Sequence, residues 1–215
     1  LDTASKIFEN NEEYLVRIYS EKSKILAYTN NLISAKKYSD LSVELSNRTN
    51  KKELKAFALY SVAYLNHTLQ NQEQVIYYGK KCLNLLEHIP QESELKAKIS
   101  YLIYMVYANW TNTKKMKEYA IATTKYAKIS KDFNILSNGF NASSSTYQLE
   151  FEKTKNKKFL DSSWYYLKKS EENYLQFKEK VAPSTQAVTY INIANYYLNY
   201  SGNDYHANLK KAEKY

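Results

Sequence analysis

A self-similarity with a period of about forty residues limits the possible folds of this chain more than any other feature. Two amphipathic stretches, separated by a short polar turn, recur five times along the 215 residues. In the clearest copy, Ile193, Ala194 and Tyr197 share one helical face. A turn at 202–204 follows, and a second helix begins near Ala207. A fixed period of this length predicts a solenoid of helical hairpins, in which each hairpin packs on its neighbours.

Alignment of the earlier segments on this copy defines a packing register. The first helices carry a small or buried residue at Ser23, Ala63, Tyr104, Ser144 and Ala194. The second helices begin their packing at Ala35, Val75, Met116, Leu160 and Ala207. The expected repeats are residues 10–49, 50–90, 91–131, 132–181 and 182–215. Antiparallel helices approach closely only where side chains are small, so these positions predict the contacts within and between hairpins.

By these residues the chain resembles the tetratricopeptide repeat family, whose repeats carry a large residue, Leu-Gly, Tyr and then Ala with an aromatic residue. The resemblance covers nearly the whole chain. Ser, Ala or Tyr replaces the family's Gly, its Trp is not kept, and the period exceeds roughly 34 residues. The resemblance implies an all-α fold, a right-handed superhelix of about five antiparallel hairpins with lengthened helices. Another helical-hairpin solenoid is the main alternative.

Composition supports this fold class, because three Gly and two Pro leave few residues that break helices. No segment shows the alternation of a β-strand. Turns within hairpins are expected at residues 29–31, 70–72, 111–113 and 154–156. Breaks between hairpins are expected at residues 47–50, 89–91, 130–132 and 182–184. In the last break Ser184 is expected to cap a helix after Pro183, and Pro90 is expected to close the helix before it.

Two features depart from the repeat. The longer fourth repeat carries small polar residues at 138–148 (NGFNASSSTYQ), which predict an exposed face or a solvated groove, and its second helix is expected to span 159–181. The chain also begins at Leu1 and stops at Tyr215 inside an expected helix. Because solenoids need terminal caps, we expect a piece of a longer protein.

Charge invites a nucleic-acid interpretation, which the residue types disfavour. Lys and Arg outnumber Asp and Glu by 31 to 22, for a net charge of +9. The excess is almost all Lys, scattered over turns and helix ends, with Arg only at 17 and 48. Since base readout and bidentate phosphate contacts favour Arg, direct nucleic-acid binding by this segment is not expected.

The sequence contains no recognisable catalytic or metal-binding motif. The three His residues form no spacing with another His, Cys or carboxylate that suits a metal, and Cys82 is alone, so no metal, cofactor or catalytic site is expected. No apolar run approaches the length of a membrane span, and no signal peptide is apparent. The compartment, bacterial cytoplasm or periplasm, therefore stays open.

In the tetratricopeptide family the first helices line a concave groove, and the resemblance carries that groove onto defined positions here. They are Arg17, Lys24, Phe57, Tyr60, Tyr64, His67, Lys98, Tyr101, Met105, Asn138, Asn141, Gln148 and Asn195. The series suits an extended peptide, since aromatic residues offer contact area and basic ones can hold an acidic group. The alternative for Phe57, Tyr60 and Tyr64 is interhelical core.

Two functions follow from these expectations, and both are non-catalytic binding of a protein or peptide. In the first, the chain is the ligand- or partner-sensing segment of a bacterial transcriptional or signalling regulator. Its long, Tyr- and Asn-rich repeats look like those of Bacteroidetes-type regulators, with a DNA-binding or membrane segment outside this stretch. In the second, it is a free-standing adaptor in a protein assembly.

Overall fold

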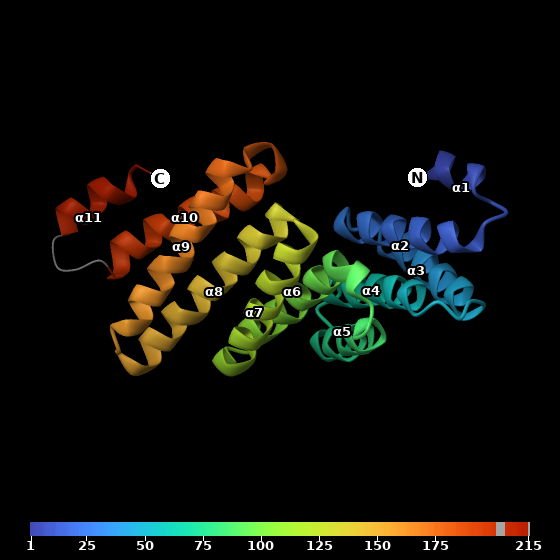
Figure 1. Cartoon of the computed structure of the whole chain (residues 1–215), viewed down its shortest axis with the longest axis horizontal. Helices are drawn as coiled ribbons and strands as arrows, with labels where there is room; N and C mark the ends of the chain where they lie inside the picture. Colours follow the sequence, from blue (N-terminus) through green and yellow to red (C-terminus); the bar gives the residue numbers. More distant parts are fainter. Residues whose placement is uncertain (201–204, 215) are drawn as a thin grey trace. The chain divides into compact units, whose positions relative to one another are not determined.

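The computed structural model describes residues 1–200 and 205–214, apart from the side chain of Tyr205, and all regular structure in these parts is helical (Figure 1). The all-α class is thereby confirmed. The α-helices are α1 (Asp2–Ile7), α2 (Glu12–Tyr28), α3 (Leu32–Asn47), α4 (Lys52–Thr68), α5 (Gln72–Leu86), α6 (Ser93–Asn109), α7 (Thr113–Ser130), α8 (Phe133–Thr154), α9 (Lys158–Gln176), α10 (Pro183–Tyr200) and α11 (Tyr205–Ala212). Short 3-10 helices are η1 (Pro90–Glu92) and η2 (Lys178–Lys180).

The chain divides into two compact units, Leu1–Val106 and Tyr107–Tyr215, with the boundary inside α6. In the first unit α2 packs against α3 and α4, and α4 packs against α3 and α5. In the second, α8 packs against α7 and α9, and α10 packs against α8, α9 and α11. Neighbours in sequence are therefore neighbours in space, as in stacked hairpins. The assembly of all five repeats into one solenoid stays a prediction.

The four expected turns within hairpins share one backbone feature. Asn30, Gln70, Thr111 and Lys155 each have a φ between 51° and 60°. A left-handed residue just after a helix lets the chain reverse direction, a role that glycine usually takes. The expected turn at 202–204 lies outside the described residues.

Side-chain caps begin several of the helices. Asn31, Asn112 and Asp132 each accept a hydrogen bond from the backbone N–H three residues further on. Such caps satisfy donors that have no partner within the helix. In this Gly-poor chain, turn chemistry therefore rests on Asn, Asp and residues with positive φ.

Burial follows the predicted register in the first four repeats. Ser23, Ala63, Tyr104 and Ser144 of the first helices are buried. Their counterparts in the second helices, Ala35, Val75, Met116 and Leu160, are buried as well. In the fifth repeat Ala194 and Ala207 are half-buried.

Pairs of buried hydroxyl groups join helices in both units. The oxygen atoms of Ser20 and Ser42 lie 2.7 Å apart between α2 and α3, and those of Ser144 and Ser163 lie 2.8 Å apart between α8 and α9. Further pairs join Ser39 to Ser61 and Ser170 to Thr189. Each hydroxyl satisfies the other, so the small side chains needed for close packing leave no unpaired polar group at these crossings.

Two expectations about helix ends in the second unit are wrong, and one about its small polar segment holds only in part. The segment 138–148 is largely buried rather than an exposed face, because its small side chains let α7, α9 and α10 pack around α8, but its Phe140 and Ser143 line a cavity. Helix α9 ends at Gln176, because Phe177 leaves helical geometry (φ −125°) and stacks on Phe133. Helix α10 begins at Pro183, whose fixed φ and missing N–H suit a first helical position, so Ser184 lies inside the helix.

No helix in the described parts of the chain combines the length and the apolar character needed to cross a bilayer.

Candidate ligand-binding sites

Five of the predicted groove residues meet in one small pocket of the first unit, which we call the charged pocket. It has a volume of about 160 Å³. Its lining consists of Arg17, Glu21, Lys24, Phe57, Tyr60, Gln91, Glu92, Glu94, Leu95 and Lys98. Predicted groove residues on α2, α4 and α6 therefore do lie together in the structure.

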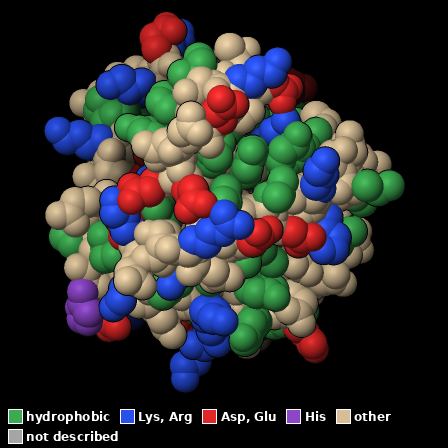
Figure 2. All heavy atoms as spheres, turned by 90° about the vertical axis from the view of Figure 1, so that its right-hand side faces the viewer, with side chains coloured by type: hydrophobic (Ala, Val, Ile, Leu, Met, Phe, Trp, Pro, Cys, Tyr) green, Lys and Arg blue, Asp and Glu red, His purple; other side chains and the backbone are tan. Residues whose placement is uncertain are grey.

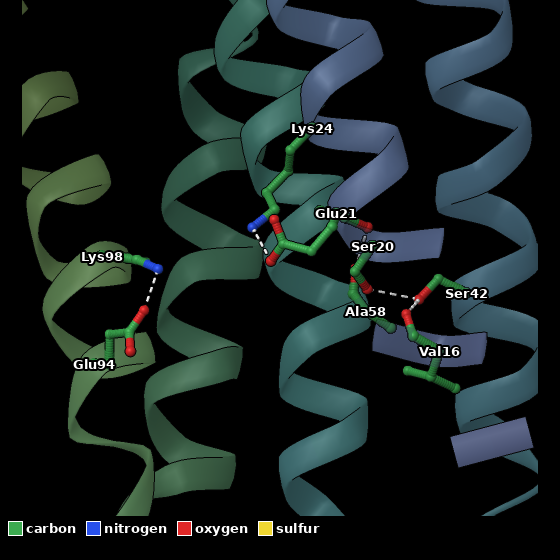
Figure 3. A network of polar contacts seen from close by, with 9 residues as sticks. Val16, Ser20, Glu21, Lys24, Ser42, Ala58, Glu94 and Lys98 are labelled. Carbon is green, nitrogen blue, oxygen red and sulfur yellow. Dashed lines mark hydrogen bonds and ion pairs between the residues drawn. The ribbon is translucent and has the colours of Figure 1, made fainter. Parts of the chain in front are cut away.

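Each cation of the charged pocket is paired with a carboxylate of the same pocket. Arg17 Nη2 lies 3.2 Å from Glu92 Oε1, and Lys24 Nζ lies 2.6 Å from Glu21 Oε1. Lys98 pairs with Glu94, and Figure 3 shows this pair beside that of Lys24. An acidic ligand would therefore have to displace carboxylates that already pair with these cations. The sequence did not predict this pairing.

The aromatic rings in this pocket contact the resident cations, so they are not free to contact a ligand. The Arg17 guanidinium lies 4.1 Å from the centroid of Phe57, and Lys24 Nζ lies 4.8 Å from that of Tyr60. Burial lowers the pKa of Lys24, an effect that the neighbouring Glu21 opposes. Tyr60 is only 7% exposed, and burial raises the pKa of its hydroxyl. Tyr60 is thus core, whereas Phe57 and Tyr64 are half-buried.

The remaining predicted residues of the first unit lie outside the lining of the charged pocket. His67 is half-buried on α4, and burial lowers its pKa. Tyr101 is half-buried and stacks on Tyr104 at 6.0 Å, and Met105 is half-buried one turn further along α6.

The predicted residues of the second unit are scattered. Asn141 is buried, and its Nδ2 donates to Thr189 Oγ1 at 3.0 Å. Its Oδ1 and Gln148 Nε2 are buried atoms with no hydrogen-bond partner among the described residues. Asn138 is half-buried and Asn195 is exposed. None of the four lines the larger cavity of this unit.

That larger cavity, which we call the α8 groove, has a volume of about 560 Å³ and lies between α7, α8 and α9. Figure 1 shows these three helices side by side. Its lining consists of Ile121, Thr124, Lys125, Lys128, Phe133, Leu136, Phe140, Ser143, Tyr165, Tyr166, Lys169, Glu172, Asn173, Gln176 and Phe177. The sequence predicted a solvated groove as one alternative for residues 138–148, which include Phe140 and Ser143, but it did not predict the lining from α7 and α9. The groove positions implied by the resemblance are other residues of α8.

Aromatic side chains form most of the apolar wall of the α8 groove. Phe133 stacks on Phe177 with ring centroids 3.6 Å apart, and Phe140 lies 6.3 Å from Tyr166. Asn173 holds one end in place, since its Nδ2 donates to the Phe133 carbonyl and to Ser137 Oγ, both at 2.8 Å. The apolar surface therefore belongs to a rigid, hydrogen-bonded framework.

The charges of the α8 groove are not balanced. Lys169 pairs with Glu172 at 2.8 Å. Among the described residues no carboxylate pairs with Lys125 or Lys128 on α7, and Lys128 Nζ lies 5.8 Å from the ring of Phe140. Positive charge thus stands beside an aromatic wall, a combination that attracts an anionic group attached to an apolar body.

Elsewhere the described residues offer little reactive chemistry. They contain no group of three or more His, Cys, Asp or Glu side chains placed to hold a metal ion. Cys82 is buried, its thiol donates to the Ala56 carbonyl, and burial raises its pKa. Figure 2 shows acidic and basic side chains intermixed on one face of the molecule, so the net positive charge forms no continuous basic surface on that face.

No family model matches this chain, and neither a curated protein nor a solved structure matches it significantly.

Proposed function

We propose that this chain is a non-catalytic helical-repeat module that binds a segment of a partner protein, and that the α8 groove is its binding site. The observation that carries this proposal is an aromatic groove whose two lysines on α7 have no carboxylate partner among the described residues. Its volume falls within the range of about 300–1,000 Å³ typical of ligand sites. The rims also expose apolar side chains that a partner would cover, namely Ile121 and Tyr165.

The packing supports a tetratricopeptide-like module as the framework for this site. Helices adjacent in sequence pack on each other, tight turns join them, and the small residues of the predicted register are buried. Two settings suit such a module: the sensing segment of a bacterial regulator and a free-standing adaptor. In a sensor, partner binding at the α8 groove is coupled to a change elsewhere, whereas an adaptor needs no such coupling.

Capture from a displayed peptide library tests the proposal. The doubly substituted chain Ile121→Asp/Tyr165→Asp alters rim positions that are 51% and 56% exposed, so the core is left intact. The matched control Ile129→Asp/Leu175→Asp changes residues of the same two helices that are 57% and 62% exposed but lie outside the groove. We expect the unsubstituted chain and the control to capture the same peptides and the rim variant to lose them. Equal capture by all three chains would refute the groove as the binding site.

Hydrogen exchange of the complex then separates the two settings. A sensor is expected to show altered protection in α2–α5 when a captured peptide occupies the α8 groove. An adaptor is expected to show changes confined to α7, α8 and α9.

A further inference from the structure

The shape and charge of the α8 groove also indicate what kind of segment fits it, an inference that rests on the proposed function. We infer that the groove binds one face of an acidic amphipathic α-helix of about three turns. Apolar side chains of that helix enter the groove between Phe133, Phe140 and Tyr166. Its carboxylates lie beside Lys125 and Lys128 on α7.

The direction and length of the α8 groove suit a docked helix. Helix α8 contributes Phe133, Leu136, Phe140 and Ser143, a single stripe with helical spacing. Helices α7 and α9 each contribute a stripe along one side, so the groove runs parallel to the helices. At about 1.5 Å per residue, the α8 stripe is roughly 15 Å long, which matches about three turns of a docked helix.

The hydrogen bonding of the groove lining favours a helix over an extended peptide. Thr124 Oγ1 donates to Ala120 O and Ser143 Oγ donates to Gly139 O, both within their own helices. The amide N–H groups of Asn173 are engaged with Phe133 and Ser137. An extended peptide needs partners for its own backbone groups, and these three side chains already use their donors within the wall, which leaves longer side chains of the lining such as Lys125, Lys128 and Gln176. An α-helix satisfies its backbone internally, so it loses little on entering such a groove.

The charges of the groove lining favour an acidic ligand. Lys125, Lys128 and Lys169 face a single carboxylate in the lining, Glu172, which already pairs with Lys169. An acidic flank on the incoming helix therefore finds two cations on α7 without displacing a resident carboxylate. A second copy of this chain is disfavoured as the occupant, because each copy carries a net charge of +9.

The test uses the full chain and three labelled synthetic peptides of fourteen residues. The acidic peptide carries Leu at positions i, i+3, i+4 and i+7 and Glu on both flanks. The basic peptide replaces every Glu with Lys, and the broken peptide keeps the acidic sequence but places two prolines in its centre. Fluorescence anisotropy at fixed salt gives the affinities. We expect the acidic peptide to bind at least about tenfold more tightly than either analogue.

Two charge-reversed variants locate the interaction. Lys125→Glu/Lys128→Glu reverses the unpaired cations of the groove. Lys114→Glu/Lys117→Glu makes the same change of net charge, at the same spacing on the same helix, with both residues exposed and outside the lining. We expect the groove variant to weaken acidic-peptide binding about tenfold and to strengthen basic-peptide binding, while the control changes either by less than about twofold.

Several outcomes would overturn the inference. Equal affinities of the broken and acidic peptides would show that the bound segment need not be helical. An equal loss of affinity in both charge-reversed variants would show non-specific electrostatic attraction. Competition by an oligonucleotide or a fatty acid at the same concentration as the acidic peptide would assign the groove to another class of ligand. If no acidic helix binds while library capture still depends on Ile121 and Tyr165, the proposed function survives and only this inference fails.

Discussion

The charged pocket and the α8 groove both combine lysine or arginine with aromatic rings, yet they differ in how the charges are partnered. In the charged pocket Arg17, Lys24 and Lys98 each have a carboxylate partner. In the α8 groove Lys125 and Lys128 have none among the described residues. Of these pairs only Arg17–Glu92 joins two elements, because Lys24–Glu21 lies within α2 and Lys98–Glu94 within α6. All three carboxylates nevertheless occupy their cations, whereas unpaired cations remain available to a ligand. Residue types alone therefore do not separate a structural cluster from a binding site.

The largest expected effect on stability comes from a glycine at a close helix contact in each unit. A Cβ atom at Gly139 would lie 2.7 Å from Thr124 Oγ1 and 3.1 Å from the Thr124 backbone N, so α7 itself would have to shift. At Gly79 the nearest atoms, at 2.8 and 2.9 Å, are Cγ1 and Cδ1 of the fully buried Ile103 side chain. We expect Gly139→Ala to lower the free energy of unfolding by about 2–3 kcal/mol. This is the net change, after the gain in helix propensity from replacing Gly with Ala is included.

Gly79→Ala serves as the matched substitution in the first unit. It is expected to cost about 1–2 kcal/mol, less than Gly139→Ala, since only the Ile103 side chain and not a helix backbone has to shift. Urea unfolding followed by circular dichroism measures both variants. A larger cost at Gly79 than at Gly139 would show that the approach of α8 to α7 is not the tighter of the two.

The next effect separates structural from available cations. Arg17→Ala leaves Glu92, which is mostly buried, without its partner and removes the contact with Phe57. We expect a loss of about 1–2 kcal/mol in the free energy of unfolding. Lys128→Ala breaks no ion pair and should change the free energy of unfolding by less than about 0.5 kcal/mol.

Denaturant midpoints compare the two variants directly. The same Lys128→Ala chain is expected to lose affinity for the captured peptides while Arg17→Ala keeps it. Reversal of these roles, with Arg17 needed for binding and Lys128 for stability, would exchange the functions assigned to the two regions.

The smallest effect is a pH dependence confined to the first unit. Burial depresses the pKa of His67 below its usual 6.5, so the unfolded chain binds a proton more readily than the folded chain. Stability attributable to His67 is therefore fully present above pH 6.5 and is lost as the pH falls towards the folded-state pKa. His67→Gln should flatten this decline, as followed by urea midpoints between pH 7.5 and 5. His88→Gln, at a side chain that is 89% exposed, is the control and should leave the decline unchanged.

Local patterns predicted much of the fold. The turns at Asn30, Gln70, Thr111 and Lys155 fall where the polar breaks lie, and the small residues Ser23, Ala63 and Ser144 are buried as the register requires. These features depend on neighbours three or four positions away or on the next helix of the same hairpin. The end of α9 was harder to predict, because the stacking of Phe177 on Phe133 joins residues far apart in sequence.

The candidate sites likewise combine features set by local sequence patterns with features set by contacts between residues far apart in sequence. By itself, the sequence determined an all-α chain of hairpins, the register of its buried positions and five of the residues that line the charged pocket. Only the tertiary structure decided that the pocket's cations are partnered, that the small polar stretch of α8 is largely buried, and that a groove opens between α7, α8 and α9. Periodicity records which side of a helix is buried against its neighbours. It carries no record of which carboxylate reaches which cation or of where three helices leave a space, since those depend on contacts between side chains far apart in the chain.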